Sequence, residues 1–268
     1  MKDFDLHSAE SRFHDGWASS EDLDKIKVKP AFESPVAMEN AYLISQMGSL
    51  KGKRILDVGA GLAESSVYFA LQGAHVTTLD LSPGMVAFAH ALAQRHNVHI
   101  EGIVGTAEEL PVRKNSFDIV YAANVLHHSE NKNSFLKHVS EALVPGGMLA
   151  SIDPLRYNPV INIYRRMATK VRTPDEEPLG FEFLDHVRQF FPEVRHAEFW
   201  LLSLALFLKY FFVDRVHPNQ DRYWKRIFRE TDRSLWWWLP LRAADRLLLR
   251  LPLANRMAWN IAILAIKK

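Results

Sequence analysis

The stretch that decides the fold is RILDVGAGLAE, residues 54–64. It begins with a short apolar run, continues through a glycine-rich turn and ends where a helical pattern starts. Glycine at positions 59 and 61 permits a tight turn and lets backbone amides approach a ligand, and the N-terminus of the following helix favours negative charge. The stretch therefore predicts a strand, a ligand-binding turn and a helix.

On both sides of this turn, short β-branched runs alternate with longer helical patterns, as in βαβ units of a parallel sheet. Five strands are predicted at residues 54–58, 74–80, 98–104, 117–123 and 148–154, and helices at 63–71, 85–95 and 133–143. Ser82-Pro83 indicates the start of the second helix, and Pro145-Gly146-Gly147 the end of the third. With two further strands at 194–200 and 258–266, the prediction is an α/β fold with a doubly wound, mostly parallel seven-stranded sheet.

The chain length suits one α/β domain with an insertion. We expect an N-terminal helical segment that covers the substrate at 1–50, a core at 51–198 and 258–268, and a helical insertion at 199–257. The chain starts with polar, acidic sequence and lacks the apolar core of a secretory signal, which predicts a cytoplasmic location. The longest uncharged apolar stretch in the C-terminal third, 199–208, falls short of the roughly 20 residues that cross a bilayer.

Acidic side chains distinguish the ligand classes that such a turn can bind. Dinucleotide-binding turns have the pattern G-x-G-x-x-G, and Glu64 stands where the third glycine would be. Asp57 precedes the first glycine by two residues, where a carboxylate suits an ammonium group better than a phosphate. Asp80 ends the next predicted strand and can accept hydrogen bonds from both hydroxyls of a ribose. These residues favour a nucleoside that carries an amino acid, and a nicotinamide-dependent oxidoreductase remains the alternative.

Four segments carry a resemblance to a known family: ILDVGAG (55–61), VTTLDLSPGMV (76–86), TAEELPVRKNSFDIVYAANVLHH (106–128) and LVPGGMLASID (143–153). In this order and spacing they resemble the class I S-adenosylmethionine-dependent methyltransferases, particularly the ubiquinone/menaquinone-methyltransferase-like group. The resemblance spans about Lys53 to Pro154. It implies a Rossmann-like methyltransferase fold, S-adenosylmethionine as cofactor and methyl transfer as the activity.

The resemblance also implies roles for individual residues. The expected cofactor-binding residues are Asp57 for the amino group, Gly59, Ala60 and Gly61 for the methionine and ribose, Asp80 for the ribose, Leu81 for adenine, Thr106, Ala107 and Glu108 for the adenine edge, and Asn124 with Leu126 near the sulfonium. The chain departs from the family's usual residues at two positions. Ala63 replaces the third glycine of G-x-G-x-G, and Thr106 replaces the usual aspartate, so the adenine contact can shift to Glu108 or to the backbone.

Methyl transfer from a sulfonium depends mainly on holding the acceptor in line at about 3–3.5 Å. An acceptor with a hydroxyl or an acidic carbon also benefits from a general base. His127 and His128 follow the fourth predicted strand, at the edge where open α/β sheets bind ligands. We interpret one of them as the base; the alternative is that they only cap a helix or hold a loop. Twelve histidines show no spacing typical of metal ligands, so no metal is predicted.

The segment that follows the fifth predicted strand, residues 157–178, is expected to be a loop on the ligand side. It contains Arg165, Arg166, Lys170 and Arg172 next to Asp175, Glu176 and Glu177. These charges predict either a lid that grips an anionic acceptor or a surface network that pairs with itself.

The predicted insertion, residues 199–257, contains eleven basic and five acidic residues, hence a net charge of +6, and five of the seven tryptophans: Trp200, Trp224, Trp236, Trp237 and Trp238. A helix over 241–251 places Leu241, Ala244, Leu247, Leu248 and Leu251 on one face, with Arg242, Asp245, Arg246 and Arg250 mostly opposite. Such a segment is typical of a peripheral membrane contact, from which the enzyme reaches a small or lipid-like acceptor, with isoprenoid and lipid-linked compounds as candidates.

The insertion and the chain as a whole leave two alternatives open. An apolar helical face also packs as an ordinary cap on a sheet, and the chain can be a catalytically silent lipid- or partner-binding protein that keeps the fold. No nucleic acid is expected as a partner, because the chain's net charge is only +2 and no nucleic-acid-reading module is present. The absence of cysteine excludes disulfides and cysteine-built zinc sites.

Overall fold

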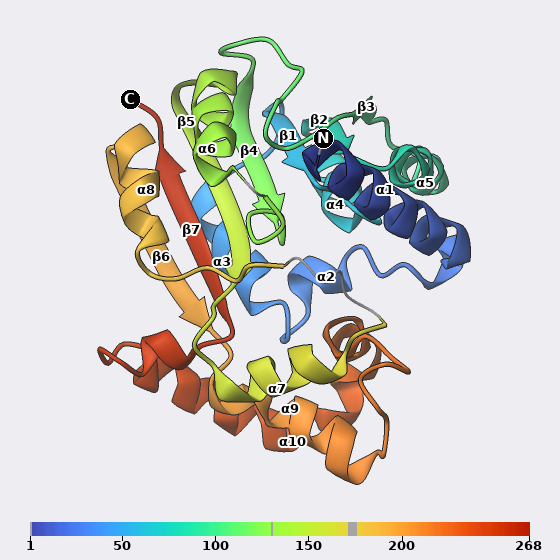
Figure 1. Ribbon diagram of the computed structural model, residues 1–268, viewed down its shortest axis with the longest axis vertical. Helices are drawn as coiled ribbons and strands as arrows, with labels where there is room; N and C mark the ends of the chain where they lie inside the picture. The colour runs from blue at the N-terminus through green and yellow to red at the C-terminus, as the bar shows by residue number, and fades with distance from the viewer. Residues whose placement is uncertain (1, 130, 171–175) are drawn as a thin grey trace.

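The computed structural model describes residues 2–129, 131–170 and 176–268; for residues 2–7, 9 and 231–235 it describes the backbone only. Seven strands form one sheet: β1 (Arg54–Val58), β2 (His75–Asp80), β3 (Glu101–Val104), β4 (Phe117–Ala123), β5 (Leu143–Pro154), β6 (Glu193–Phe199) and β7 (Asn260–Ile266). Their order is β3-β2-β1-β4-β5-β7-β6 (Figure 1). β7 pairs antiparallel with both β5 and β6, and the other described strand pairs are parallel. The predicted doubly wound, mostly parallel sheet is confirmed.

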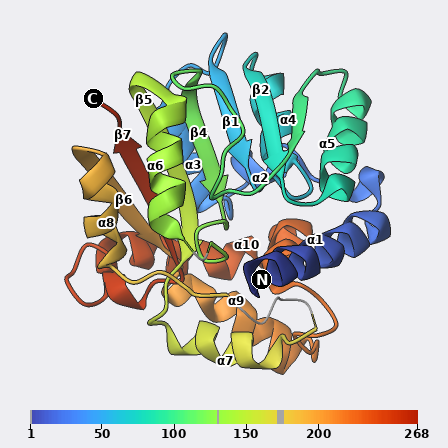
Figure 2. The same cartoon turned by 45° about the horizontal axis from the view of Figure 1, so that its top comes forward.

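The helices before β6 are α1 (Lys2–Ser20), η1 (Leu23–Lys25), α2 (Pro30–Glu33), α3 (Met38–Met47), α4 (Glu64–Leu71), α5 (Pro83–Arg95), α6 (Lys132–Ala142), α7 (Pro159–Met167) and α8 (Phe183–Phe190). Those between β6 and β7 are η2 (Leu202–Leu204), α9 (Ala205–Leu208), η3 (Lys209–Val213), α10 (Tyr223–Leu248) and η4 (Asn255–Met257). Figures 1 and 2 show α7, α9 and α10 as a helical layer beyond the carboxyl ends of β4 and β5.

Successive side chains of each strand point to opposite faces of the sheet. Helices pack against both of these faces. Leu56 and Val58 belong to a core cluster that includes Phe135 and Leu136 of α6 and Val187 of α8. The intervening Ile55 belongs to a second cluster, which includes Leu43 of α3, Val67 of α4 and Leu92 of α5. The result is a three-layer arrangement in which the strand ends remain available for a site.

Local signals in the sequence explain most of the element boundaries. Ser82 caps α5 by accepting a hydrogen bond from the backbone of Met85, with Pro83 as the first helical residue. Asn131 caps α6 in the same way through the backbone of Ser134. These contacts leave fewer unsatisfied amides at the helix starts and agree with the predicted helices.

The prediction that Pro145-Gly146-Gly147 closes the third helix is wrong. The helix ends at Ala142, and β5 starts directly at Leu143. The pairing of β5 with β4 then shifts between Leu143 and Met148, where Gly146 adopts a φ of +77°. The glycines therefore serve a bulge inside the strand rather than a stop signal after the helix.

The prediction of a loop throughout 157–178 is also wrong. Residues 159–167 form α7, because Pro159 occupies its first position and the Asn158 side chain caps the backbone of Ile161. Within the described part of this segment, Arg165 donates hydrogen bonds to Leu155 O and Asn162 Oδ1, and Arg166 is exposed. Arg172 and Asp175, whose charges were expected to belong to this lid or surface network, lie outside the described residues.

Candidate active site

The glycine turn between β1 and α4 passes close to the loop that follows β4. Gly59 and Gly61 adopt φ angles of +64° and +51°, a conformation that costs other residues about 1–2 kcal/mol each. A Cβ atom on Gly59 would lie 2.5 Å from Cγ2 of Val125, whereas one on Gly61 would meet open space. The close approach of the turn to Val125 therefore requires glycine at position 59, whereas Gly61 leaves the backbone of the turn open to a ligand.

Asp57 is buried beneath this turn, with 1% of its surface exposed. Its Oδ2 accepts hydrogen bonds of 2.6 Å from the hydroxyls of both Ser65 and Ser66 in α4. Burial raises the pKa of Asp57 to about 7; the serine hydrogen bonds oppose the shift, and the charges of Asp80 and Glu64 add to it. The carboxyl group thus anchors the start of α4, a structural contact that the sequence did not reveal.

Asp80, at the end of β2, joins the glycine turn to the start of α5. Its Oδ2 accepts a hydrogen bond from the amide of Gly61, and its Oδ1 accepts one from the amide of Ser82, both at 2.9 Å. Burial raises the pKa of Asp80 above its ordinary value, while these two amides act in the opposite direction. The two acidic strand ends predicted from the sequence therefore lie on either side of the same turn.

A cavity of about 510 Å³ opens at the carboxyl ends of β1, β2 and β4. It is lined by twelve site residues that the sequence predicts: Asp57, Gly59, Ala60, Gly61, Asp80, Leu81, Thr106, Ala107, Glu108, Asn124, His127 and His128. Their individual roles stay predictions. Leu126, expected near the sulfonium, instead has 0% exposure and packs in the core with Phe135 and Leu136.

The N-terminal helix α1 contributes to the cavity from one side. Ser11 Oγ donates a hydrogen bond to the backbone oxygen of Leu81, and Asp15 Oδ1 accepts one of 2.8 Å from the amide of Gly84. Glu10, His14 and Trp17 of the same helix line the cavity. Sequence reasoning missed these residues because no local pattern in α1 reports which strand end it will cover.

His127 is held by a buried carboxyl group. Its Nδ1 lies 2.8 Å from Asp153 Oδ1, and its backbone amide donates to the same oxygen at 3.1 Å. Asp153 is completely buried, and burial raises its pKa well above the ordinary value. Asp153 was not predicted, although it lies in the last part of the fifth predicted strand, next to the strand that carries the histidines.

Two further carboxylates approach the histidine pair. Glu176 Oε2 lies 3.9 Å from His127 Nε2, and Glu10 Oε1 lies 3.1 Å from His128 Nδ1. The two imidazole rings are 4.1 Å apart, centroid to centroid. The site thus combines side chains from α1, the loop after β4, the end of β5 and the segment before α8.

Another part of the cavity lining is apolar and aromatic, next to polar residues such as Glu39, Asn40 and Asn260. It includes Val36, Ile161, Trp200, Ile227 and Trp259, and the first four belong to a single buried cluster under the C-terminal helices. The cavity lining therefore combines the glycine turn and its carboxylates with apolar rings and branched side chains.

Helix α10 meets α1 and α4 next to the cavity. The Lys225 ammonium forms an ion pair with Glu64, at the start of α4. The Arg222 guanidinium lies 4.2 Å from the ring centroid of Trp17 and 3.8 Å from a carboxylate oxygen of Glu21. These contacts join segments from both ends of the chain around one site, and explain what Glu64 contacts in place of the glycine of dinucleotide folds.

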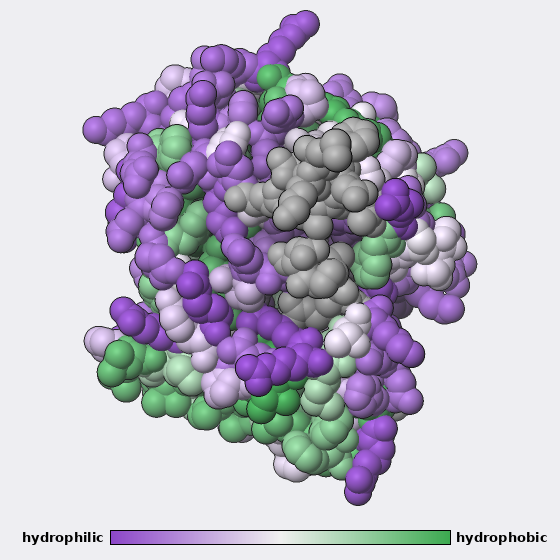
Figure 3. Space-filling view, in the orientation of Figure 1, coloured by the Kyte–Doolittle hydropathy of each residue, from purple (hydrophilic) through white to green (hydrophobic). Residues whose placement is uncertain are grey.

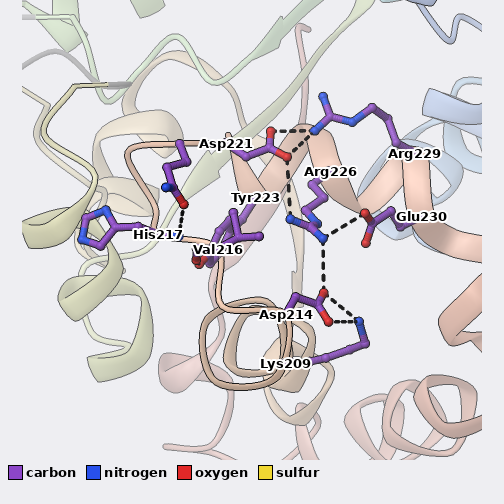
Figure 4. Close-up of polar contacts among 10 residues, drawn as sticks. Lys209, Asp214, Val216, His217, Asp221, Tyr223, Arg226, Arg229 and Glu230 are labelled. Carbon is purple, nitrogen blue, oxygen red and sulfur yellow. Dashed lines mark hydrogen bonds and ion pairs between the residues drawn. The ribbon is translucent and has the colours of Figure 1, made fainter.

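Much of the positive charge between β6 and β7 is balanced locally (Figure 4). Asp214 accepts hydrogen bonds from Lys209 and Arg226, and Arg226 also pairs with Glu230 at 3.0 Å. Arg229 pairs with Asp221. This part of the predicted insertion is therefore a paired network, and its charge is not free to bind an anion.

Comparison with known proteins identifies the domain. Residues 56–151 match the model of a family described as a methyltransferase domain. The chain is 36% identical over 100 residues to a ubiquinone biosynthesis O-methyltransferase of Azorhizobium caulinodans, covering 37% of this chain and 40% of that protein. It is 29% identical over 138 residues to a sterol 24-C-methyltransferase of Gibberella zeae, covering 50% of this chain and 36% of that protein.

A solved structure supports the same fold. The phosphoethanolamine N-methyltransferase 2 of Haemonchus contortus, in complex with phosphomonomethylethanolamine and S-adenosylhomocysteine, aligns with a TM-score of 0.56 at 18% identity, covering 86% of this chain and 52% of that one. This chain carries a class I, S-adenosylmethionine-dependent methyltransferase domain. It spans only 36 to 40% of the two curated relatives, so their acceptors are not transferred to it.

The residues of the methyltransferase domain fit its cofactor. The turn leaves open space at Gly61 that a side chain would fill, and Asp57 and Asp80 line the same cavity. Thr106, at the position of the family's aspartate, also lines the cavity, together with Glu108. Ala63 takes the left-handed conformation of the missing third glycine, with a φ of +59°, so the substitution preserves the turn.

Proposed function

We propose that this protein transfers the methyl group of S-adenosylmethionine to a lipophilic acceptor. One observation carries the proposal: a single cavity connects the cofactor-type glycine turn to a wall of apolar and aromatic side chains. Apolar surface of this kind favours an acceptor that loses water-exposed hydrocarbon area on binding. The two relatives named for ubiquinone and sterol methylation are consistent with such an acceptor.

In this proposal, Asp57 holds the amino group of the cofactor and Asp80 its ribose, with Gly59, Ala60 and Gly61 along the backbone between them. Leu81, Thr106, Ala107 and Glu108 surround the adenine. Asn124, in the loop after β4, lines the same cavity and is the residue we place beside the sulfonium. The cofactor supplies an activated methyl group, so the chain's main task is to hold the acceptor in line and exclude water.

His127 and His128 are the groups placed to act on the acceptor. An acceptor hydroxyl or acidic carbon that takes the methyl group must release a proton, and an imidazole can accept it near neutral pH. Asp153 orients His127 through the 2.8 Å contact with Nδ1, as the carboxylate does in a catalytic triad. The same oxygen accepts a hydrogen bond from the backbone amide of His127, so Asp153 holds both the loop and the ring of the proposed base.

Binding measurements test the proposed function. Calorimetry with S-adenosylhomocysteine should show stoichiometric binding, and NADH should not bind, since Glu64 and Asp57 disfavour a pyrophosphate. A lipid extract incubated with methyl-labelled cofactor should then yield a labelled apolar product. If the protein bound neither S-adenosylhomocysteine nor NADH and labelled no product, it would be a catalytically silent binding protein.

Replacing both His127 and His128 by alanine should abolish labelling and leave S-adenosylhomocysteine binding intact. The matched control is His99→Gln, because His99 is exposed and outside the cavity lining. Unchanged turnover in the double variant would remove the histidines as bases and leave the methyltransferase assignment standing.

We also propose that the acceptor is reached at a membrane surface from the cytoplasmic side. Trp236, Leu247, Leu251 and Leu253 are exposed by 80%, 66%, 55% and 72%, and Figure 3 shows apolar side chains along the lower edge, where the C-terminal helices lie. Arg242, Arg246 and Arg250 lie among them and form no ion pair with the described side chains. Exposed apolar residues next to arginines suit an interface of anionic lipids.

None of the described helices is long and apolar enough to span a bilayer. The proposed contact is peripheral, and co-sedimentation with anionic vesicles should be strong at low salt and weaker at high salt. The variant Leu247→Glu/Leu251→Glu should lose it, whereas the control Leu71→Glu, at an exposed apolar site on α4, should keep it. If the protein sedimented with vesicles at neither low nor high salt, the membrane contact would be refuted, and the proposal of methyl transfer would still stand.

A further inference from the structure

The histidine pair lies within a group of possible metal ligands. One ligand atom from each of His127, His128 and Glu176 lies within 4.8 Å of the other two. The adjacent histidines have no spacing typical of a metal motif, and Glu176 is far from them in the sequence. The group is therefore formed by the fold, which brings the segment before α8 against the loop after β4.

The chemistry of the three side chains suits a divalent transition metal. Two imidazoles and one carboxylate form the protein ligand set of several catalytic zinc sites, in which a fourth position stays open for water or substrate. The 3.9 Å between His127 Nε2 and Glu176 Oε2 is longer than a hydrogen bond and leaves room for an ion with bonds of about 2.0–2.2 Å to each.

The surroundings of His127 strengthen this assignment. Metal-bound histidines commonly use their second ring nitrogen to contact a carboxylate, which fixes the ring orientation and the tautomer. Asp153 provides this contact to Nδ1 at 2.8 Å, from a position with 0% exposure. The same ring directs its other nitrogen, Nε2, toward Glu176. A ring held by a buried carboxylate, with its other nitrogen toward a second ligand, is an arrangement common at metal sites.

We propose that His127, His128 and Glu176 bind a divalent transition metal such as Zn²⁺, which holds an oxygen of the methyl acceptor. This inference rests on the proposed methyl transfer, replaces proton acceptance by an imidazole with ionisation of a metal-held hydroxyl, and specifies the acceptor as an oxygen compound, such as a phenol or an alcohol. All three residues line the same cavity as the glycine turn. Metal binding would lower the pKa of the acceptor hydroxyl, which then loses its proton to solvent.

The methyl-transfer step balances under this arrangement. The acceptor oxygen donates an electron pair to form the new oxygen–carbon bond. The sulfur–methyl bond breaks, and its electrons stay on sulfur as a neutral thioether. No oxidant or reductant is needed, and the proton released from the acceptor hydroxyl is the only other product.

Metal titration of the whole protein tests the inference. After dialysis against a chelator, calorimetric titration with Zn²⁺ and absorbance titration with Co²⁺ should each show one tight equivalent. Glu176→Gln and His128→Gln should weaken that site by at least about 100-fold, and Asp153→Asn by about 10- to 100-fold. The control His99→Gln should bind as the unmodified protein does, which separates the site from adventitious binding by surface histidines.

Thermal unfolding of each variant shows whether it is folded, so that loss of the metal is not mistaken for loss of the structure. A metal-free protein that bound S-adenosylhomocysteine but took up no Zn²⁺ or Co²⁺ tightly would overturn the metal site alone and leave His127 as a simple base. One tight equivalent that survived both Glu176→Gln and His128→Gln would also overturn it. Failure to bind S-adenosylhomocysteine would instead count against the proposed function.

Discussion

At the scale of single residues, the glycine turn shows that backbone conformation and available space are separate constraints. Gly59, Gly61 and Ala63 all adopt positive φ angles. Ala63 tolerates its conformation although it carries a Cβ atom and is fully buried. Of these three positions, Gly59 is the one where a Cβ atom would collide with a neighbour, 2.5 Å from Val125 Cγ2.

Gly59→Ala should therefore lower the free energy of unfolding by about 2–4 kcal/mol, from backbone strain and overpacking together. Gly61→Ala should cost only the strain, about 1–2 kcal/mol, and Ala63→Gly should change stability by less than about 1 kcal/mol in either direction, because relief of strain opposes chain entropy. Urea unfolding measures all three. Equal losses for the two glycine variants would contradict the role of Val125.

Asp57 makes the stability of the fold depend on pH. Burial raises its pKa from 3.8 to about 7, so the folded state keeps the proton over this range while the unfolded chain releases it. The stabilising contribution of the protonated group is complete below about pH 4 and is lost as the pH rises to about 7.

Asp57→Asn should flatten the fall of the free energy of unfolding over this window, by at most about 1.4 kcal/mol per pH unit. Urea unfolding at a series of pH values gives the slope. Some slope should remain, because burial also raises the pKa of Glu39, Asp80 and Asp153. A variant with the slope of the unmodified protein would show that Asp57 does not hold its proton.

At the scale of elements, α10 shows that the apolar and polar faces predicted for residues 241–251 do not correspond to a buried and an exposed face. Asp245, expected on the polar face, is 2% exposed, and Leu247, expected on the apolar face, is 66% exposed. Asp245 faces inward because its carboxylate accepts hydrogen bonds from the amides of residues 201, 202 and 203 and from the Ser203 hydroxyl. Trp200 and Trp238 are likewise buried here, whereas Trp236 is exposed.

Asp245→Ala should lower the free energy of unfolding by about 2–4 kcal/mol, because it leaves buried donors without an acceptor. The neighbouring Arg246→Ala is the matched control; Arg246 is exposed, and its loss should change stability by less than about 0.5 kcal/mol. Chemical denaturation compares the two. Similar small effects would mean that other contacts hold α10 in place.

At the scale of the whole molecule, the cavity is bounded by segments from both ends of the chain. Trp17 of α1 and Trp224 of α10 pack edge to face with centroids 5.8 Å apart, and both line the cavity. A ligand that binds between the glycine turn and these helices should therefore stabilise segments that are distant in sequence.

Saturation with S-adenosylhomocysteine at about 100 times its dissociation constant should stabilise the fold by about 2.7 kcal/mol. Hydrogen exchange should slow in α1 and in the first turns of α10 as well as around residues 59–64. Adenosine, which lacks the amino-acid part, is the comparison ligand. Protection confined to the glycine turn would indicate that α1 and α10 do not close the site.

The sequence by itself determined the sheet, the glycine turn and the two acidic strand ends. These features follow from patterns local to the chain: alternation of apolar residues sets a strand, a cap residue sets a helix start, and glycine permits a turn. Strand ends of a parallel sheet meet at one edge, so Asp57, Asp80 and His127 could be placed together without any knowledge of side-chain packing.

Only the tertiary structure decided which residues of the covering helices reach that edge and which way those helices face. Asp153 and Glu176 join His127, α1 lies against Leu81, and Asp245 turns inward, because each contact depends on side chains that meet across long separations in the chain. A periodic pattern defines the two faces of a helix but not the partner that each face will contact. That choice depends on how whole elements pack, since most polar groups that become buried find a hydrogen-bond partner, as Asp245 does on the segment after β6.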